Sequence, residues 1–389
     1  MSTTNASQRA KDLWQGPANE PPIPIWLDCD TGHDDAFAIL VSALTPHLHL
    51  LGISTTHGNA PLPQTTANTI SILTAISRPS IPVHPGSPHP ICRPPCFAPD
   101  IHGASGLDGT TRLPTPGFNP ADKPAVQAAY DALMATPRGT AYVVATGTLT
   151  NIALLFLSYP LLAGHVKGVH IMGGAVGDGF TVAPMGTTSD DPEDEGGRFG
   201  NWTPFAEFNI YADPEAARAV LGLEGLRGKV TLVPLDLSHL FLATEGVQRG
   251  LLGGFGGEEK EGGEEEEEGT GVRRLFHEIL VFFAKTYRDV FALVEGPPLH
   301  DVLPVLAVFA PGIFDDRGGE RFDVDVVIDG AHGTEGIART ESRVGQTVVK
   351  KVEGEGVRIP RGVDGEVAWR IIDLCLGVAE KLGKKSSVQ

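Results

Sequence analysis

Cysteine is scarce in this sequence, with four residues in 389: Cys29, Cys92, Cys96 and Cys375. Their spacing fits no zinc-binding or dithiol motif, and so low a content excludes a scaffold held together by disulfide bonds. Cys29 lies between two acidic residues, and we expect it to pack inward as a small apolar side chain.

Long apolar runs are also missing. The apolar stretch 279–284 is far too short to span a bilayer. Residues 1–22 are polar and contain proline, without the apolar core of a signal sequence, and the final Ser-Val-Gln is no recognisable targeting signal. These features predict a cytoplasmic protein that has no membrane partner.

Basic residues are outnumbered, because 30 Lys and Arg face 48 Asp and Glu, which gives a formal net charge of -18. Eight Glu and one Lys within residues 258–268 contribute -7 of this charge, so the rest of the chain carries -11. An acidic surface argues against nucleic acid as a partner, since the phosphate backbone is negative too. It is compatible with an uncharged small molecule as substrate.

Apolar residues make up 41% of the chain, enough for a sizeable core. Short apolar segments alternate with helical patterns, an order typical of an α/β fold with an open, mostly parallel sheet flanked by helices. No second core is needed, so we predict a single domain at residues 23–382, a disordered tail at 1–22 and a loose tail at 383–389. We expect strands at 23–27, 47–54, 141–147, 166–172, 229–235, 322–328 and 347–352, and helices at 34–44, 64–76, 125–135, 272–294 and 363–382.

Two segments interrupt this pattern. Residues 177–203 are rich in glycine and acids, and we interpret them as an inserted surface loop near the mouth of a site. Residues 250–271 are a Gly/Glu low-complexity segment that cannot bury apolar area, so we expect disorder there. Both are predicted to interrupt the domain without dividing it.

Four carboxylates crowd the turn between the first strand and the first helix: Asp28, Asp30, Asp34 and Asp35. In an open α/β sheet, ligands bind beyond the carboxyl ends of the strands. Acids so close together repel one another, and a hard divalent cation would hold them, because carboxylate oxygen is its preferred ligand. The alternative is that Asp34 and Asp35 are only acids at a helix start, which leaves the other two unexplained.

Other polar residues are expected at the same edge of the sheet. Asn59 lies just beyond the second strand, and Thr146 ends the third. His102 belongs to a long Pro/Gly-rich loop at residues 77–124, of a kind that is usually functional or disordered. Simpler interpretations exist: an Asn that stabilises a turn, an ordinary surface histidine, and, for Asp301, a helix N-cap.

The motif Asp28-Cys-Asp-Thr-Gly-His-Asp-Asp35 resembles the D-x-D-x-G-x-D-D motif of the inosine–uridine nucleoside hydrolases. Further segments resemble that family in the same order along the chain, and the match spans about residues 23–375 apart from the two insertions. These segments are H-G-x-x-G-L-D-G at 102–109, T-G-x-L-T-N at 146–151, A-E-F-N at 206–209, L-D-x-[ST]-H at 235–239 and H-D at 300–301. The resemblance implies a Rossmann-like nucleoside hydrolase fold, a homodimer or homotetramer, and a role in nucleoside catabolism and salvage.

The resemblance also implies the chemistry: hydrolysis of the N-glycosidic bond of inosine, uridine and related ribonucleosides to free base and ribose. One Ca²⁺ per active site would be held by Asp30, Asp35, Asp301 and the main-chain carbonyl of Thr146, and Asp30 would be the general base. His300 would assist the leaving base. The remaining residues would bind substrate: Asp34, Asn59, Glu207 and Asn209 the ribose hydroxyls, Met172 the sugar, and His102 the base.

Three questions stay open. Asp28-Cys-Asp30-Thr31 also fits the D-x-D-x-T motif of haloacid-dehalogenase-type phosphatases, with Asp28 as nucleophile, Asp30 as acid/base and Mg²⁺ as cofactor. A catalytically silent nucleoside-binding homologue is the second alternative, because the insertion before Glu207 could displace the ribose-binding residues. Oxygen ligands accept magnesium as well as calcium, and the base preference is not decided.

Overall fold

The computed structural model describes residues 3–187, 198–255, 271–332 and 342–386. Its centre is a six-stranded parallel sheet with the strand order β3-β2-β1-β4-β5-β6. Most residues of these strands are buried, as parallel strands covered on both faces require, and this explains their short, nearly continuous apolar runs. The strands are β1 (Ile23–Cys29), β2 (Leu48–Thr55), β3 (Val83–Pro85), β4 (Tyr142–Ala145), β5 (Gly168–Met172) and β6 (Val230–Val233).

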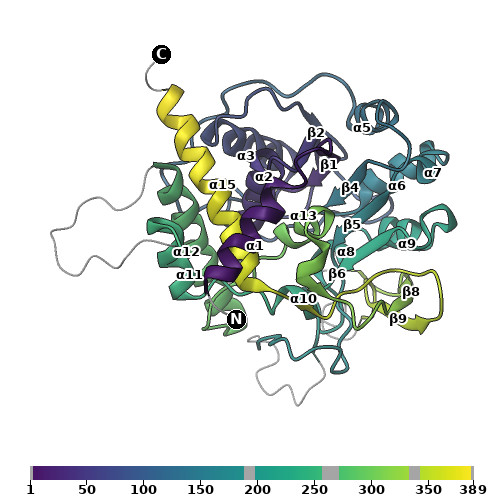
Figure 1. The fold of residues 1–389 in the computed structure, drawn as a ribbon. Helices are drawn as coiled ribbons and strands as arrows, with labels where there is room; N and C mark the ends of the chain where they lie inside the picture. Colours follow the sequence, from purple (N-terminus) through teal and green to yellow (C-terminus); the bar gives the residue numbers. More distant parts are fainter. Residues whose placement is uncertain (1–2, 188–197, 256–270, 333–341, 387–389) are drawn as a thin grey trace.

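Helices cover both faces of the sheet (Figure 1). Alternate residues of β1 enter different apolar clusters, with Ile25 and Leu27 in one and Trp26 in the other. The helices are α1 (Thr3–Gln15), α2 (His33–Leu44), α3 (Leu62–Ala75), α4 (Pro99–His102), α5 (Ala125–Met134), α6 (Thr150–Ser158), α7 (Leu162–His165), α8 (Phe208–Ala212), α9 (Pro214–Leu221), α10 (Leu235–Ser238), α11 (Glu245–Gly253), α12 (Gly271–Phe291), α13 (Val302–Phe309) and α15 (Gly365–Ser386). The expected single α/β domain with an open parallel sheet is confirmed.

Two small antiparallel pairs lie outside the main sheet. Strand β8 (Arg321–Val326) pairs with β9 (Thr347–Val352), as their alternating pattern indicated. Strand β7 (Phe314–Asp315) pairs with β10 (Gly362–Val363). Two 3₁₀ turns, at Glu224–Leu226 and Pro311–Ile313, complete the described elements.

The expected disorder of residues 1–22 is wrong for α1, which packs along the C-terminal helix α15 (Figure 1). Ala6 and Ala10 are buried in this contact, and Arg9 forms an ion pair with Asp364 at 2.6 Å. Residues 1–22 are polar overall, but they include a narrow apolar stripe at helical spacing. The stripe is hard to recognise because it consists partly of small alanines.

Other boundaries differ at the insertions and at the C-terminus. Helix α15 continues to Ser386, so most of the tail expected at 383–389 is helical. Helix α11 takes up the first residues of the segment expected to be disordered at 250–271, while 256–270 lie outside the described residues. Residues 188–197 of the insertion 177–203 also lie outside the described residues. In the part of the chain that is described, no helix is long and apolar enough to cross a membrane.

Candidate active site

A cavity of about 320 Å³ lies beyond the carboxyl ends of the central strands. Nine of the eleven site residues expected from the sequence line it: Asp34, Asn59, His102, Thr146, Met172, Glu207, Asn209, His300 and Asp301. The other two, Asp30 and Asp35, are fully buried and interact electrostatically with Asp34 and Asp301. Residues from position 30 to position 301 are therefore brought to one place.

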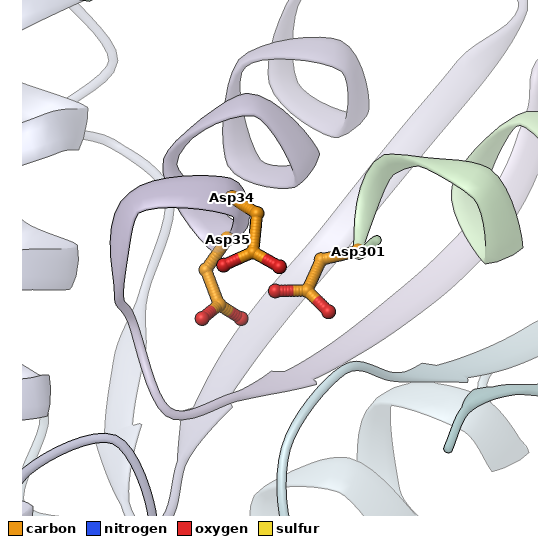
Figure 2. A group of neighbouring side chains, drawn as sticks. All are labelled: Asp34, Asp35 and Asp301. Carbon is orange, nitrogen blue, oxygen red and sulfur yellow. The ribbon is translucent and has the colours of Figure 1, made fainter. Parts of the chain in front are cut away.

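Three carboxylates converge at the cavity. Asp34 and Asp35 come from the first turn of α2 and Asp301 from the start of α13, and Figure 2 shows their side chains turned toward one another. One oxygen of each lies within 4.8 Å of the others. Asp301 occupies the N-cap position of α13, but its side chain makes no capping hydrogen bond, so capping does not explain it.

Asp35 is held by three donors. Its Oδ2 accepts from the main-chain N–H of Gly32 at 2.8 Å and from Nδ2 of Asn59 at 3.2 Å, and its Oδ1 accepts from Oγ1 of Thr146 at 2.7 Å. The bond from Gly32 also stabilises the start of α2, so the interpretation of Asp35 as a helix-start acid is partly right.

Asp30 has one satisfied and one free oxygen. Its Oδ2 accepts from the main-chain N–H of Asn59 at 2.7 Å, while Oδ1 is buried without a partner in the described chain. Gly58 and Gly147 enclose this carboxylate: a Cβ at Gly58 would overlap Oδ2, and one at Gly147 would lie 2.6 Å from Oδ1. Only glycine permits so close an approach of the backbone.

Burial is the largest cause of the raised carboxylate pKa values, and neighbouring acids add to it. It raises the pKa of Asp34 to about 7 and that of Asp35 to about 6. The pKa values of Asp30 and Asp301 are raised well above their ordinary value. Among the described residues no Lys or Arg lines the cavity to offset this charge.

These observations fit a bound divalent cation. The unpartnered Oδ1 atoms of Asp30 and Asp301 and the carboxylates of Asp34 and Asp35 form an all-oxygen donor set, which a hard cation prefers. The group of three within 4.8 Å contains Asp34, which the sequence placed at the ribose, and does not contain Asp30. The carbonyl oxygen of Thr146 accepts from Nδ2 of Asn209 at 2.9 Å and keeps a second lone pair.

The residues expected at the ribose keep their place despite the insertion. Glu207 is the N-cap of α8, and its carboxylate accepts from the main-chain N–H groups of Asn209, Ile210 and Gly174 at 2.8 to 3.0 Å. The last residues of the insertion, Asn201 and Trp202, line the cavity themselves. The insertion therefore shapes the cavity and does not displace Glu207.

Both ring nitrogens of His300 are engaged. Nδ1 lies 2.7 Å from Oγ of Ser238, and Nε2 lies 2.7 Å from the hydroxyl oxygen of Tyr287. Ser238 belongs to the 235–239 segment, one of those that resemble the family motifs. Tyr287 was not predicted, because α12 was interpreted only as a long helix.

Aromatic side chains form much of the rest of the wall. The sequence reasoning missed them, although Phe283, Tyr287 and Phe291 follow at helical spacing on one face of α12 and could have been found by it. The aromatic residues that line the cavity are Phe97, Trp202, Phe208, Phe283, Tyr287 and Phe291.

Asp28, the nucleophile required by the phosphatase hypothesis, does not line the cavity. Its Oδ1 accepts from Nδ2 of Asn151 at 2.8 Å and from Oγ of Ser54. Burial raises its pKa to about 7. The phosphatase hypothesis is wrong in its central residue, and Asp28 instead ties β1 to its neighbours.

Comparison with known proteins gives a consistent result. The model of the family described as inosine-uridine preferring nucleoside hydrolase matches residues 25–370. A uridine nucleosidase from Saccharomyces cerevisiae is 40% identical over 294 residues, which are 74% of this chain and 77% of the yeast protein. A pyrimidine-specific ribonucleoside hydrolase from Klebsiella pneumoniae is 33% identical, over 75% of this chain and 81% of the bacterial one.

Solved structures share the fold. A purine-preferring ribonucleoside hydrolase from Gardnerella vaginalis superposes with a TM-score of 0.70 and 22% identity, over 92% of this chain and 99% of that chain. A plant nucleoside hydrolase gives a TM-score of 0.70 and 24% identity with the same coverage.

Proposed function

The chain belongs to the family of inosine-uridine preferring nucleoside hydrolases and is an enzyme that hydrolyses ribonucleosides to free base and ribose, and we propose from the geometry of its cavity which residues do so. The observation that carries the proposal is the convergence of Asp30, Asp34, Asp35 and Asp301 beside a cavity with an aromatic wall.

The substrates are uncharged nucleosides, with inosine and uridine as the first to test. Aromatic residues offer surfaces on which a base can stack. The acids that line the cavity, Asp34, Asp100, Glu207, Asp289 and Asp301, repel a phosphate group. Nucleoside monophosphates should therefore be far poorer substrates than the corresponding nucleosides.

Ca²⁺ is the cofactor that we propose, held by Asp30, Asp35, Asp301 and the carbonyl oxygen of Thr146, with Asp34 beside it. A divalent cation bound there would lower the pKa of a water molecule that it binds. The donor set supports an oxygen-preferring cation, and cation replacement after chelation distinguishes Ca²⁺ from Mg²⁺.

Asp30 is the proposed general base. Its Oδ2 is occupied by the main-chain N–H of Asn59, which leaves the unpartnered Oδ1 to take a proton from the attacking water. The glycines on either side hold the carboxylate in place without covering this oxygen by a side chain.

The ribose-binding residues stabilise the growing positive charge on the sugar. Cleavage of an N-glycosidic bond passes through an oxocarbenium-like transition state, as in glycoside hydrolysis. Glu207, held rigidly by three main-chain N–H groups, and Asp34 present negative charge in the cavity. Carboxylates in fixed positions favour this transition state over the neutral substrate. Asn59, Asn209 and Met172 complete the contacts to the sugar.

The leaving base is stabilised by a hydrogen bond from Tyr287 in this proposal, and His300 orients the Tyr287 hydroxyl. His300 has no free ring nitrogen, since Ser238 and Tyr287 occupy both. With Nε2–H of His300 donated to the phenol oxygen, the hydroxyl hydrogen of Tyr287 can be donated in a hydrogen bond to the leaving base. Burial raises the pKa of Tyr287 well above its usual value, so the hydroxyl keeps its hydrogen and remains a hydrogen-bond donor.

Release of ribose from inosine and uridine, with and without a chelator, tests this function. We expect hydrolysis that chelation abolishes and added calcium restores. Attack of water on the face opposite the base predicts inversion at the anomeric carbon, which NMR of the first-formed ribose anomer measures. Retention of configuration would contradict the mechanism. A homodimeric or homotetrameric state and a cytoplasmic location stay predictions, for sedimentation and cell fractionation to test.

A further inference from the structure

Two histidines from distant elements meet beside the cavity. His33 begins α2 and His102 ends α4, and their Nδ1 atoms lie 3.1 Å apart. His33 is fully buried, and its ring stacks on Phe282 and Phe283 with centroid distances of 5.1 and 5.4 Å. The mechanism above uses neither His33 nor this contact.

The partners of His33 determine where its hydrogen lies. Its Nε2 is 2.9 Å from the main-chain carbonyl oxygen of Asp108, and a carbonyl oxygen can only accept, so Nε2 carries the hydrogen. The Asp108 carboxylate is occupied by Ala104 and Ser105, and no carboxylate is hydrogen-bonded to His33 among the described residues. His33 is fully buried beside two phenyl rings, where a charged ring without a carboxylate partner would be costly, so the ring is neutral and its Nδ1 is an acceptor.

An accepting Nδ1 on His33 requires a donor on His102. The donor is the hydrogen on Nδ1 of His102, and a neutral imidazole then has a bare Nε2. The Nδ1 edge of His102 is packed against the turn before α2, since a Cβ at Gly32 would lie 2.5 Å from that Nδ1. His102 lines the cavity, so its opposite edge, which carries Nε2, is left to face the ligand.

We propose that His33 is a positioning residue that holds His102 in the tautomer with a bare Nε2, and that this acceptor selects nucleobases presenting an N–H group to it. The inference rests on the proposed function, since the base must lie in this cavity. Uracil and hypoxanthine each carry a ring N–H, at N3 and N1, whereas a methyl group on that nitrogen removes the donor. The specificity comes from an acceptor that would be left unpaired beside the wrong base.

The tautomer is measured without any substrate. Long-range ¹H–¹⁵N spectra of the histidine-labelled resting enzyme, with His102→Gln used only to assign the signals, show which ring nitrogen carries the hydrogen. We expect hydrogen on Nδ1 of His102 in the wild type and in His33→Asn, whose amide oxygen can still accept. In His33→Phe, which keeps the aromatic stacking but has no acceptor, this preference should be lost. Hydrogen on Nε2 of wild-type His102 would overturn the proposal.

Selection of the base is measured by paired substrates: uridine against 3-methyluridine, and inosine against 1-methylinosine. Loss of the donor should lower kcat/KM at least about tenfold in the wild type and in His33→Asn. The ratio of kcat/KM for the parent nucleoside to kcat/KM for its methylated form should fall toward one in His33→Phe. Steric exclusion of the methyl group alone would not produce this change. Equal kcat/KM for methylated and parent nucleosides would overturn the selection. Failure to cleave either parent nucleoside would instead refute the proposed function, and the spectra would still decide the tautomer.

Discussion

The two carboxylate oxygens of Asp30 have different environments, and this assigns them different roles in the site. The main-chain N–H of Asn59 binds one, and the other is buried without a partner. Replacing Asp30 by Asn removes the base while keeping the shape. We expect kcat to fall by about 10²- to 10⁴-fold, with an unchanged or higher melting temperature when the two proteins are compared in the presence of a chelator, since one buried negative charge is lost.

Steady-state assays and thermal unfolding measure both effects. Asp28→Asn is the matched control, because Asp28 is equally buried but lies outside the proposed cation site, with its Oδ1 bonded to Asn151 and Ser54. Its effect on kcat should be much smaller than that of Asp30→Asn. Equal losses in the two variants would contradict the assignment of the base.

Tyr287 offers a second test among single residues. Tyr287→Phe keeps the ring in the cavity wall but removes the hydroxyl that contacts His300. We expect kcat for inosine to fall about a hundredfold or more, since the hydrogen bond that stabilises the leaving base is lost. p-Nitrophenyl riboside should be much less affected, because p-nitrophenolate leaves without a proton. A similar loss on both substrates would show that Tyr287 acts on the sugar or the water instead.

Sequence reasoning found the acids and the His300-Asp301 pair because their residue types carry the chemistry and follow one another in a recognisable order. It could not assign Tyr287 a role, since an aromatic residue on a helix face more commonly belongs to the core. Asn201 was missed for another reason, because it lies at the end of an acidic insertion whose composition indicated only a surface loop. Which oxygen of Asp30 is free depends on the path of the backbone around it, which no sequence pattern shows.

At the scale of elements, five of the six strands of the main sheet were predicted closely because buried parallel strands have short apolar runs that few other structures share. Strand β3 was missed, since its three residues lie within the Pro/Gly-rich segment expected to be a loop. The N-terminal helix α1 was not, because its buried residues are alanines within a polar sequence. Short helices such as α4 and α8 also escaped, since four or five residues show no periodicity.

Helix α1 should contribute to stability without affecting catalysis. Ala10 is completely buried against α15, so Ala10→Asp places an unpaired charge there. We expect the free energy of unfolding to fall by about 2 kcal/mol or more, with kcat/KM unchanged under native conditions. Lys11→Asp, on the exposed side of the same helix, is the control for added charge. Urea titrations of the two variants measure the difference, and equal destabilisation would show that the packing contributes little.

For the whole molecule, the crowded acids should make stability depend on the proposed cation. Asp30, Asp34, Asp35 and Asp301 repel one another, and a cation bound only to the folded state offsets this repulsion. Chelation should lower the free energy of unfolding by about 3 kcal/mol relative to protein holding the cation at about a hundred times its Kd. Thermal unfolding across a calcium titration measures this. Asp301→Asn should reduce the dependence of the melting temperature on calcium concentration. A wild-type melting temperature that does not change with calcium concentration would contradict the proposed site.

Buried histidines should make the folded protein sensitive to acid. His170 on β5 donates from Nδ1 to the carbonyl oxygen of Pro304 at 3.1 Å, and burial lowers its pKa from 6.5 to about 4. Between these two pH values the unfolded chain binds a proton that the folded chain does not. The stabilisation that depends on neutral His170 is therefore complete above pH 6.5. It is lost as the pH falls toward 4, at up to about 1.4 kcal/mol per pH unit. His170→Asn should reduce the slope of unfolding free energy against pH in this range, and an unchanged slope would assign the acid sensitivity to other groups.

The separation in sequence between α2 and α13 has a consequence for synthesis of the chain. Asp34 and Asp35 leave the ribosome more than 260 residues before Asp301, so the nascent protein carries an incomplete cation pocket for most of its translation. A fragment that stops before α13 would keep the strands of the six-stranded sheet and the first acids, yet lack the carboxylate of Asp301. A cation that needs all of these carboxylates would therefore discriminate between finished and truncated copies, and its retention would report that the polypeptide has been made and folded almost to its end.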